Sequence, residues 1–562
     1  MRKYYIRGKG EVRLSDADFK GQGGQAAIYA QGSTAYKIYS DRLSTITEAK
    51  IRELSVLDAP SIIKPLDVLV DGNGNLAGYS MRYIDRGYLL CQLFPAAFRN
   101  RHNLTPDRAL ELVQRLQRGV AFVHSKSILI VDLNEMNFLV SDDLENVFFL
   151  DVDSYQTPSF PATAIMDSIR DRHATKFDRS TDWFAFAIVS FQIFTGLHPY
   201  KGTYPPLVGS VDKSSMLDER MKANISVLHP GVTVPSTCLP LTVIPPVYLD
   251  WYRATLESGA RQSPPGGPLD STTIRVLPAP APAGGSLFRI SAALEFDDEV
   301  LEMFSEVTRT QKSVYLRGQR LDCPDPQMKI ALTPRSMRAI GFRLEGSSAC
   351  FVDLRNEISI DGEVRADEII AIDGRAYVKR HTELMELEFI ELASRILVRP
   401  RTVGHVMKNA TQLFEGVVFQ NLLGAWYASF LPEPHTCYQA RIKELDGYRI
   451  VDARSEHNVL LVIAMISGRY DRFTFRFERE FDDYDVRIQR DVDNAGITFT
   501  VLDNGICLSL AGEHLEVFKC RPGSDGLRIV PAADLAGVRL FHHGAQALFG
   551  RSHKVFKFSL RA

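Results

Sequence analysis

The chain has 562 residues, which is too long for one hydrophobic core and predicts two or three domains. With 45% hydrophobic and 24% charged residues, it has the composition of an ordinary globular protein. Its 66 basic and 68 acidic side chains leave a net charge of −2, so no global field favours nucleic acid or an anionic membrane. No segment approaches the ~20 apolar residues of a membrane span, and the basic first residues lack the apolar run of a signal peptide.

The seven cysteines are scattered along the chain, and no two of them form a CxxC pair. This pattern predicts neither a zinc site nor a disulfide framework. We therefore expect free, mostly buried thiols and a cytoplasmic location.

The first part of the chain, residues 1–275, begins with short strand-like segments and continues with helical patterns. Thr105 followed by Pro106 marks the start of a long amphipathic helix. Residues 182–194 are apolar on nearly every side, as expected of a buried helix. A small sheet followed by helices predicts an α+β domain with a small lobe of about residues 1–84 and a large lobe of about residues 85–275.

Residues 276–286 are rich in Pro, Ala and Gly, which cannot continue a helix or a central strand, and we interpret them as a linker. Beyond it, residues 287–562 show the period-two alternation of an all-β domain. A diffuse repeat of about 43 residues, with Gly374, Gly505 and Gly544 at three of its starts, is the size of one propeller blade. The repeat predicts a β-propeller of about six blades, with a pair of β-sandwiches as the alternative.

A segment of sequence Gly-Gln-Gly-Gly-Gln-Ala-Ala-Ile lies between two strand-like stretches. Gly21, Gly23 and Gly24 would let the backbone approach phosphate oxygens, and Ile28 would cover a flat base. Alone this pattern is weak, because glycine-rich turns are common. Lys37 follows in an alternating strand and would neutralise phosphate charge, although an exposed edge-strand lysine would look the same.

Two glutamates of a helical stretch after Lys37 are candidates to pair with it. Glu48 shares a helix face with Ile51 and is the favoured partner, and Glu53 is its competitor. Further along, a strand runs into a connector, where the backbone of Arg82 to Ile84, including Tyr83, would hold the edge of an adenine.

The strongest segment contains Asp132 and Asn137, five residues apart before an apolar strand, and Asp151 at the end of a second strand. This order lets Asn137 and Asp151 share magnesium while Asp132 accepts a proton from an attacking hydroxyl. Hard oxygen ligands suit magnesium that arrives with a nucleotide. Each residue alone is explained equally well as a turn cap, and Asp153 either adds a metal oxygen or caps the next turn.

Together these motifs resemble the eukaryotic-like Ser/Thr protein kinase family in its divergent bacterial and phage form, over roughly half of the chain. Lys37 resembles the strand lysine of the V-A-I-K motif, and Met81 the gatekeeper before the hinge. Asp151 stands where the aspartate of D-F-G would be. The resemblance also implies that Asp182 ties the catalytic loop in place and that Arg261 is a structural arginine of the large lobe.

The sequence departs from that family at several positions. Ile130 and Val131 replace the His and Arg of the catalytic loop, and Asn134 replaces its lysine. Val152 and Asp153 replace the Phe and Gly of D-F-G, and no A-P-E triplet is evident. Activation by capture of an activation-loop phosphate is therefore not expected.

Because Lys37, Asp132, Asn137 and Asp151 are all retained, we expect a signalling protein Ser/Thr kinase that uses ATP and Mg²⁺. The β domain would recruit a protein substrate or partner. One alternative is a pseudokinase scaffold whose nucleotide site controls what the β domain binds. A second is a small-molecule or lipid kinase.

Overall fold

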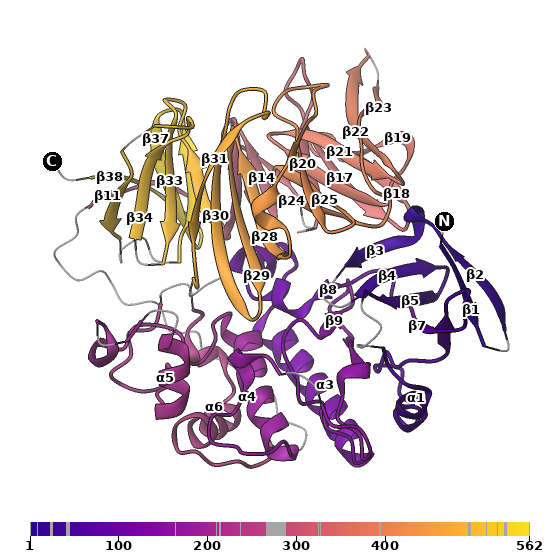
Figure 1. Cartoon of the computed structure of the whole chain (residues 1–562). Coiled ribbons are helices and arrows are strands. Elements are labelled where there is room, and N and C mark those ends of the chain that lie inside the picture. The colour runs from indigo at the N-terminus through magenta and orange to yellow at the C-terminus, as the bar shows by residue number, and fades with distance from the viewer. Residues whose placement is uncertain are drawn as a thin grey trace.

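The structure is a computed structural model in which an N-terminal part of sheet and helices lies against a C-terminal part made of strands (Figure 1). The predicted linker at 276–286 lies outside the described residues. Among the described helices, none is long and apolar enough to cross a membrane. The structure describes residues 2–7, 9–22, 26–40, 45–162, 165–209, 211–212, 215–235, 238–265, 288–323, 325, 327–392, 395–492, 496–512, 514–524, 526–532, 535 and 537–560.

A seven-stranded antiparallel sheet begins the N-terminal part, in the order β2-β1-β6-β7-β5-β4-β3. Its strands are β1 (Arg2–Ile6), β2 (Gly10–Leu14), β3 (Phe19–Gln22), β4 (Ala26–Gln31), β5 (Thr34–Tyr39), β6 (Val68–Val70) and β7 (Leu76–Arg82). The register places Lys37 of β5 opposite Ile28 on one side and opposite Tyr79 on the other. The residues expected to hold phosphate and base are therefore neighbours on adjacent strands.

The helices that follow are built as the sequence predicts. Thr105 caps the long helix by accepting a hydrogen bond from the Arg108 amide, and the predicted apolar helix is almost wholly buried. The helices are α1 (Glu48–Leu54), α2 (Ala96–Arg101), α3 (Pro106–Ser125), α4 (Arg179–Thr195), α5 (Met216–Ala223) and α6 (Pro246–Tyr252). A three-stranded sheet of β8 (Tyr88–Leu89), β9 (Phe138–Val140) and β10 (Val147–Phe149) contacts α3 and carries the loops of the candidate site.

The C-terminal part consists, within the described residues, of seven four-stranded antiparallel sheets. In six of them the strands follow chain order, and in the seventh β11 from the start of this part pairs with β38 from its end. The six are β12 (Val300–Phe304), β13 (Val307–Thr310), β14 (Ser313–Leu316), β15 (Gln319–Asp322); β16 (Lys329–Leu332), β17 (Ala339–Glu345), β18 (Ser348–Asp353), β19 (Ile358–Arg365); β20 (Glu368–Ile372), β21 (Arg375–Arg380), β22 (Glu383–Glu391), β23 (Ile396–His405); β24 (Thr411–Phe414), β25 (Val417–Leu422), β26 (Ala425–Phe430), β27 (Tyr438–Arg441); β28 (Arg449–Glu456), β29 (Val459–Ile466), β30 (Arg469–Phe477), β31 (Tyr484–Gln489); and β32 (Thr498–Val501), β33 (Ile506–Ala511), β34 (His514–Lys519), β35 (Arg528–Pro531). The seventh is β11 (Phe288–Glu295) with β36 (Arg539–His543), β37 (Gln546–Arg551) and β38 (Lys554–Leu560).

The all-β prediction is confirmed, but the expected number of about six repeats is one short of the seven sheets described. Gly374 and Gly505 lie in the turn between the first two strands of their sheets, and Gly544 lies in the turn between β36 and β37, with φ of 74°, 77° and 60°. Two early sheets make the same turn with Ser305 and Met337 at positive φ instead of glycine. These repeats therefore lack the glycine signal of the later ones, and the count of about six came from the mean spacing of about 43 residues in the later part of the domain.

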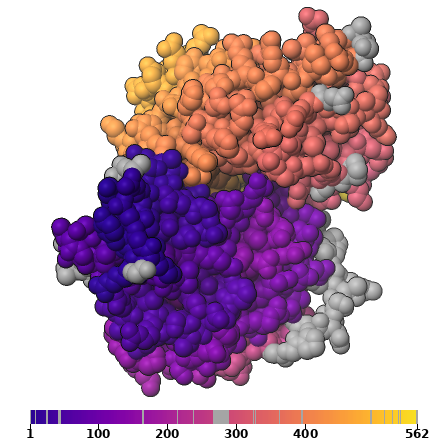
Figure 2. All heavy atoms as spheres, turned by 90° about the vertical axis from the view of Figure 1, so that its right-hand side faces the viewer, coloured from indigo at the N-terminus to yellow at the C-terminus, as the bar shows by residue number. Residues whose placement is uncertain are grey.

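The two parts contact each other through the hairpin β29–β30, which reaches down to the helices in Figure 1. Val459, Leu461 and Ile463 of β29 belong to the same buried hydrophobic cluster as the core of the helical lobe. Figure 2 shows the two parts stacked, with a hollow between them. That hollow corresponds to a cavity of about 910 Å³ lined by residues of both parts.

Candidate active site

Lys37 is buried, with 9% of its surface exposed, in the middle of the N-terminal sheet. Its strand lies very close to β7, because a Cβ added at Gly78 would be 2.0 Å from the Lys37 carbonyl oxygen. A residue with a side chain at Gly78 would push β5 and Lys37 out of position. The sheet thus fixes the backbone from which the Lys37 ammonium reaches the site.

The Lys37 Nζ contacts two carboxylates that follow β10. It is 2.5 Å from Asp151 Oδ1 and 2.9 Å from both oxygens of Asp153. Burial works against the charged lysine, but Asp153 and Asp151 raise the pKa of Lys37 above its ordinary value. Lys37 is therefore held as a cation beside two acids.

Asp153 is the buried centre of this network, with 8% of its side chain exposed. The hydroxyls of Tyr39 and Tyr79 donate to its carboxylate at 2.5 and 2.6 Å. Although burial alone would raise the pKa of Asp153, Lys37 and the two tyrosines hold it below its usual value. Asp153 thus orients Lys37, a role that the sequence analysis missed because its donors lie on distant strands.

The expected pairing of Lys37 with Glu48 is not formed in this structure. Glu48 is the first residue of α1 and pairs with Arg7 of the N-terminal hairpin. Its competitor Glu53 accepts a hydrogen bond from the Ser159 amide at 3.2 Å. The carboxylates that reach Lys37 come from the segment after β10, not from the helix.

Asp132 and Asn137 face each other across the loop before β9. The amide nitrogen of Asn137 donates to the Asp132 carbonyl at 2.9 Å and to Asp132 Oδ2 at 3.3 Å. This arrangement leaves the amide oxygen of Asn137 as the atom with the chemistry of a metal ligand. Asp151, whose side chain is 39% exposed, adds carboxylate oxygens, so the donor set fits a magnesium ion bound with a nucleotide.

The other oxygen of Asp132 is already engaged. The Met166 amide, in the segment between the Asp151 loop and α4, donates to Asp132 Oδ1 at 2.8 Å. This oxygen is one of the two that would accept the proton of an attacking hydroxyl. In the structure described here, a backbone group of the chain itself therefore occupies part of the position expected for a substrate hydroxyl.

The loop that carries Asp132 is anchored by Asp182, as the resemblance implies. The carboxylate of Asp182 is fully buried on α4 and accepts the Ile130 and Val131 amides, each at 2.8 Å. His124 lies 2.8 Å from the same carboxylate. Val131 has φ of 63°, which is costly for a β-branched residue, and the Asp182 contact stabilises that conformation.

Arg261 also has the structural contact expected of it. Its guanidinium donates to both carboxylate oxygens of Asp171 at 2.6 and 2.9 Å, and it lies over the Phe184 ring. Asp171 follows the Met166 segment, in the stretch where no A-P-E triplet is evident. A bidentate pair of this kind fixes the end of the segment against the helical lobe.

The expected nucleotide-base residues are only partly assembled. Ile28 of β4 lies opposite Lys37 on one side and opposite Gly21 of β3 on the other. Met81 lies on β7. Gly23 and Gly24 lie outside the described residues. The Tyr83 amide, expected to contact an adenine, donates instead to the Ser33 carbonyl at 2.8 Å. Ile84 follows Tyr83 and is half-buried.

The cavity of about 910 Å³ between the two parts borders this region without containing the catalytic candidates. Tyr83 and Lys20 line one wall of it, and Glu415 lies on the other side. Lys37, Asp132 and Asp151 are not among its lining residues. The hydrogen-bonded carboxylates, rather than this cavity, therefore define the candidate active site.

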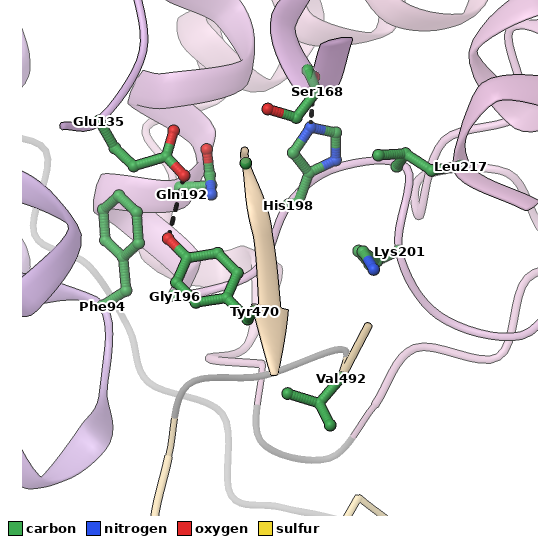
Figure 3. Close-up of a pocket in the computed structure, with 11 residues that line it drawn as sticks. Phe94, Glu135, Ser168, Gln192, Gly196, His198, Lys201, Leu217, Tyr470 and Val492 are labelled. Atoms are coloured by element: carbon green, nitrogen blue, oxygen red, sulfur yellow. Dashed lines mark hydrogen bonds between the residues drawn. The ribbon is translucent and has the colours of Figure 1, made fainter. Parts of the chain in front are cut away.

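The β29–β30 hairpin contacts the loop that carries Asp132 and Glu135 directly (Figure 3). The Tyr470 hydroxyl of β30 donates to Glu135 Oε1 at 2.9 Å. Glu135 is 2% exposed, and burial raises its pKa. At the hairpin turn, a Cβ added to Gly468 would lie 2.7 Å from Met166 Sδ and 2.9 Å from Ser168 Oγ. The C-terminal part therefore packs against the same segment that covers Asp132.

An ion pair outside the hairpin strengthens this contact. Lys201, after α4, lies 2.5 Å from Asp491, which follows β31. Beside it, His198 Nε2 lies 2.8 Å from the Ser168 carbonyl, as Figure 3 shows. Burial lowers the pKa of His198 to about 3, so the imidazole is neutral and donates to this carbonyl.

One relative gives weak support for a kinase-like N-terminal region. The chain is 24% identical over 168 residues to the serine/threonine-protein kinase pkn2 of Myxococcus xanthus, a match that covers 27% of this chain and 19% of that protein. The chain therefore spans about a fifth of the length of that relative. The solved structure of the kinase PK-1 of Cydia pomonella granulovirus is 16% identical, with a TM-score of 0.32 over 45% of this chain and 88% of that one. No model of a protein family matches.

Proposed function

We propose that this chain is an ATP- and Mg²⁺-dependent protein kinase that phosphorylates Ser or Thr. The observation that supports it best is the meeting of Lys37, Asp132, Asn137 and Asp151 around one site, on a loop anchored by Asp182. These groups supply the cation, the metal ligands and the proton acceptor that phosphoryl transfer requires. The weak similarity to a Ser/Thr kinase agrees with this assignment.

Each residue then has a defined role. ATP, when bound, would supply the phosphoryl group, and magnesium would neutralise its charge. Asn137 and Asp151 would hold the metal, Lys37 and the glycine segment would hold the phosphates, and Asp132 would orient the hydroxyl and accept its proton. Asp153 replaces Glu48 as the acid that orients Lys37.

For the C-terminal part we infer a closed β-propeller that binds a substrate or partner protein. The pairing of β11 with β38 supports closure, because it joins the two ends of this part in one sheet. Contacts of β36 with both β12 and β32 support it further, since they join this sheet to its two neighbours in the expected ring. A ring of short sheets is a rigid platform whose loops suit protein recognition.

The contact between the two parts favours a restrained kinase. A substrate hydroxyl that uses Asp132 Oδ1 would have to displace the Met166 amide, and Gly468 of the β29–β30 hairpin lies against Met166. A partner that pulls the hairpin away would release this segment. The β part thus regulates the site as well as recruiting to it.

The same contact favours a pseudokinase scaffold as the second candidate. An Asp132 that stays covered, together with Asn134 in place of a phosphate-binding lysine, would bind Mg·ATP without transfer. In that case, nucleotide binding would change the position of the β29–β30 hairpin and the partner that the C-terminal part binds.

Intact mass of phosphatase-treated protein after incubation with Mg·ATP separates the two candidates. A kinase gains phosphoryl groups in the wild type and not in Asp132→Asn, whose side chain can no longer accept the proton. A scaffold gains none in either but still binds Mg·ATP. Equal gains in both proteins would show that Asp132 is not the catalytic base.

A further inference from the structure

Two histidines and a glutamate meet at one place in the C-terminal part, far in sequence from the candidate active site. One potential ligand atom each of Glu456, His457 and His542 lies within 4.8 Å of the other two. Glu456 ends β28 and His457 begins the turn after it, whereas His542 lies on β36 of another sheet. The fold, rather than local spacing, therefore brings the three together.

The Glu456 carboxylate is held firmly by hydrogen bonds, including those from the sheet that lies between the sheet of β28 and the sheet of β36. Its Oε1 accepts the Val501 amide at 2.7 Å and the Thr500 hydroxyl at 2.9 Å, and Arg454 donates to Oε2 at 3.1 Å. The His542 ring is oriented by the same groups, with Nδ1 2.8 Å from Thr500 Oγ1 and 3.3 Å from Glu456 Oε1. Ligands fixed in advance by hydrogen bonds are a requirement of a metal site.

The remaining donors lie on the open side of the His542 ring. Asp503 Oδ1 is 3.7 Å from His542 Nε2 and could add a further carboxylate ligand. The exposed His457 ring has its centroid 6.5 Å from that of His542, and its backbone is held at φ of 54° by the turn. Two imidazoles and one or two carboxylates therefore border one small space.

We propose that Glu456, His457 and His542 bind a first-row divalent metal ion of the zinc class. Imidazole nitrogen selects zinc, nickel, cobalt or copper over magnesium and calcium, which prefer oxygen ligands. The ion would link the β28–β31 sheet to the sheet of β36, across the sheet that holds Thr500. The site is independent of phosphoryl transfer, so it stands or falls separately from the proposed kinase activity.

Calorimetric titration of the full chain, first stripped of metal with a chelator, tests the proposal. We expect one equivalent of Zn²⁺ to bind and to raise the melting temperature with concentration. His457→Asn should weaken binding at least about tenfold, because it removes one ligand while Asn tolerates the left-handed turn. His553→Asn is the matched control, an exposed histidine beside a single glutamate, with Nε2 3.4 Å from Glu295 Oε1.

The proposal is overturned by any of three results. The first is that the stripped chain binds no Zn²⁺ in the calorimeter and that Zn²⁺ does not raise its melting temperature. The second is an unchanged affinity in His457→Asn, or the same loss in the His553→Asn control. The third is displacement of bound Zn²⁺ by an equal concentration of Mg²⁺, which would show that imidazole nitrogen does not select the ion at this site.

Discussion

The acids around Lys37 and the buried Glu135 both lie in the N-terminal part of the molecule, but different parts of the chain hold them in place. Asp151 and Asp153 reach Lys37 from within that part, through charge and short hydrogen bonds. Glu135 is held from outside, by Tyr470 of a hairpin that lies 335 residues further along the chain. The acids of the Lys37 region are held by their own part of the chain, whereas Glu135 depends on contact with the C-terminal part.

The difference separates two functions. The Lys37 region contains the groups that we propose to hold a nucleotide, and the hydrogen bonds of Lys37 and Asp153 among the described residues come from the N-terminal part. We propose that the Glu135 region controls access to Asp132, because its hairpin lies against the Met166 segment. A change in the first region should therefore affect chemistry, and a change in the second should affect access and stability.

The largest expected effect is in the Lys37 region. Asp153→Asn keeps the size of the side chain but removes the charge beside Lys37, so Lys37 is no longer fixed against the phosphates. We expect the rate of phosphoryl transfer to fall about a hundredfold, in kcat more than in KM. Steady-state kinetics with a Ser/Thr peptide substrate measures this.

Glu48→Gln is the matched control for that experiment. Glu48 pairs with Arg7 at the surface in this structure, so its loss should change the rate little. A large loss of rate in Glu48→Gln, with little change in Asp153→Asn, would support the pairing of Lys37 with Glu48 that was first expected from the sequence.

The second effect is a dependence of stability on pH beneath the hairpin. Burial lowers the pKa of His198 to about 3, below its value in the unfolded chain. As pH falls below about 6.5 the unfolded state takes up this proton first, so stability is lost, by about 2 kcal/mol at pH 5. Urea unfolding at pH 7.5 and pH 5 measures the change, and His198→Gln should show the smaller loss. Equal losses of stability in both proteins would show that His198 does not cause the pH dependence.

The third effect concerns the hydrogen bond between the two parts. Tyr470→Phe leaves the buried Glu135 without this donor and should cost about 1.5 kcal/mol in urea unfolding. Tyr315→Phe is the control, because its hydroxyl donates to the exposed Asp297 at 3.2 Å and should matter little. If the two variants lose the same stability, the Tyr470 contact does not join the parts.

The smallest expected effect is on access to Asp132. Gly468→Val should push the hairpin turn off Met166, speed hydrogen exchange of the Met166 amide, and raise phosphoryl transfer about threefold. Gly318→Val carries the same backbone penalty, since the two glycines have φ of 76° and 79°, but nothing lies within 4 Å of its Cβ. Slower transfer in Gly468→Val than in Gly318→Val would mean that the hairpin supports the site instead of restraining it.

The sequence predicts the candidate site wherever the signal is local. Asp132 and Asn137 lie five residues apart on one loop, so their spacing predicts their contact. The contact of Asp182 with that loop was expected from the resemblance to the kinase family and not from spacing. The all-β character of the C-terminal part was likewise visible from alternation along each strand.

The rest depended on contacts that spacing does not encode. Asp153 takes its donors from Tyr39 and Tyr79, more than 70 residues away, and nothing near Asp153 distinguishes a lysine partner from a turn cap. The hairpin contact at Gly468 and the convergence of Glu456 with His542 require the docking of whole sheets. Such long-range packing becomes visible only once the chain is folded.

The most direct test of the account is calorimetric binding of a non-hydrolysable ATP analogue to the full chain, with and without Mg²⁺. The account predicts one magnesium-dependent site that is weakened by Lys37→Met and by Asp151→Asn, and unchanged by Glu48→Gln. Absence of binding, or binding that needs neither magnesium nor these two residues, would contradict the claim that the acids around Lys37 form a nucleotide site.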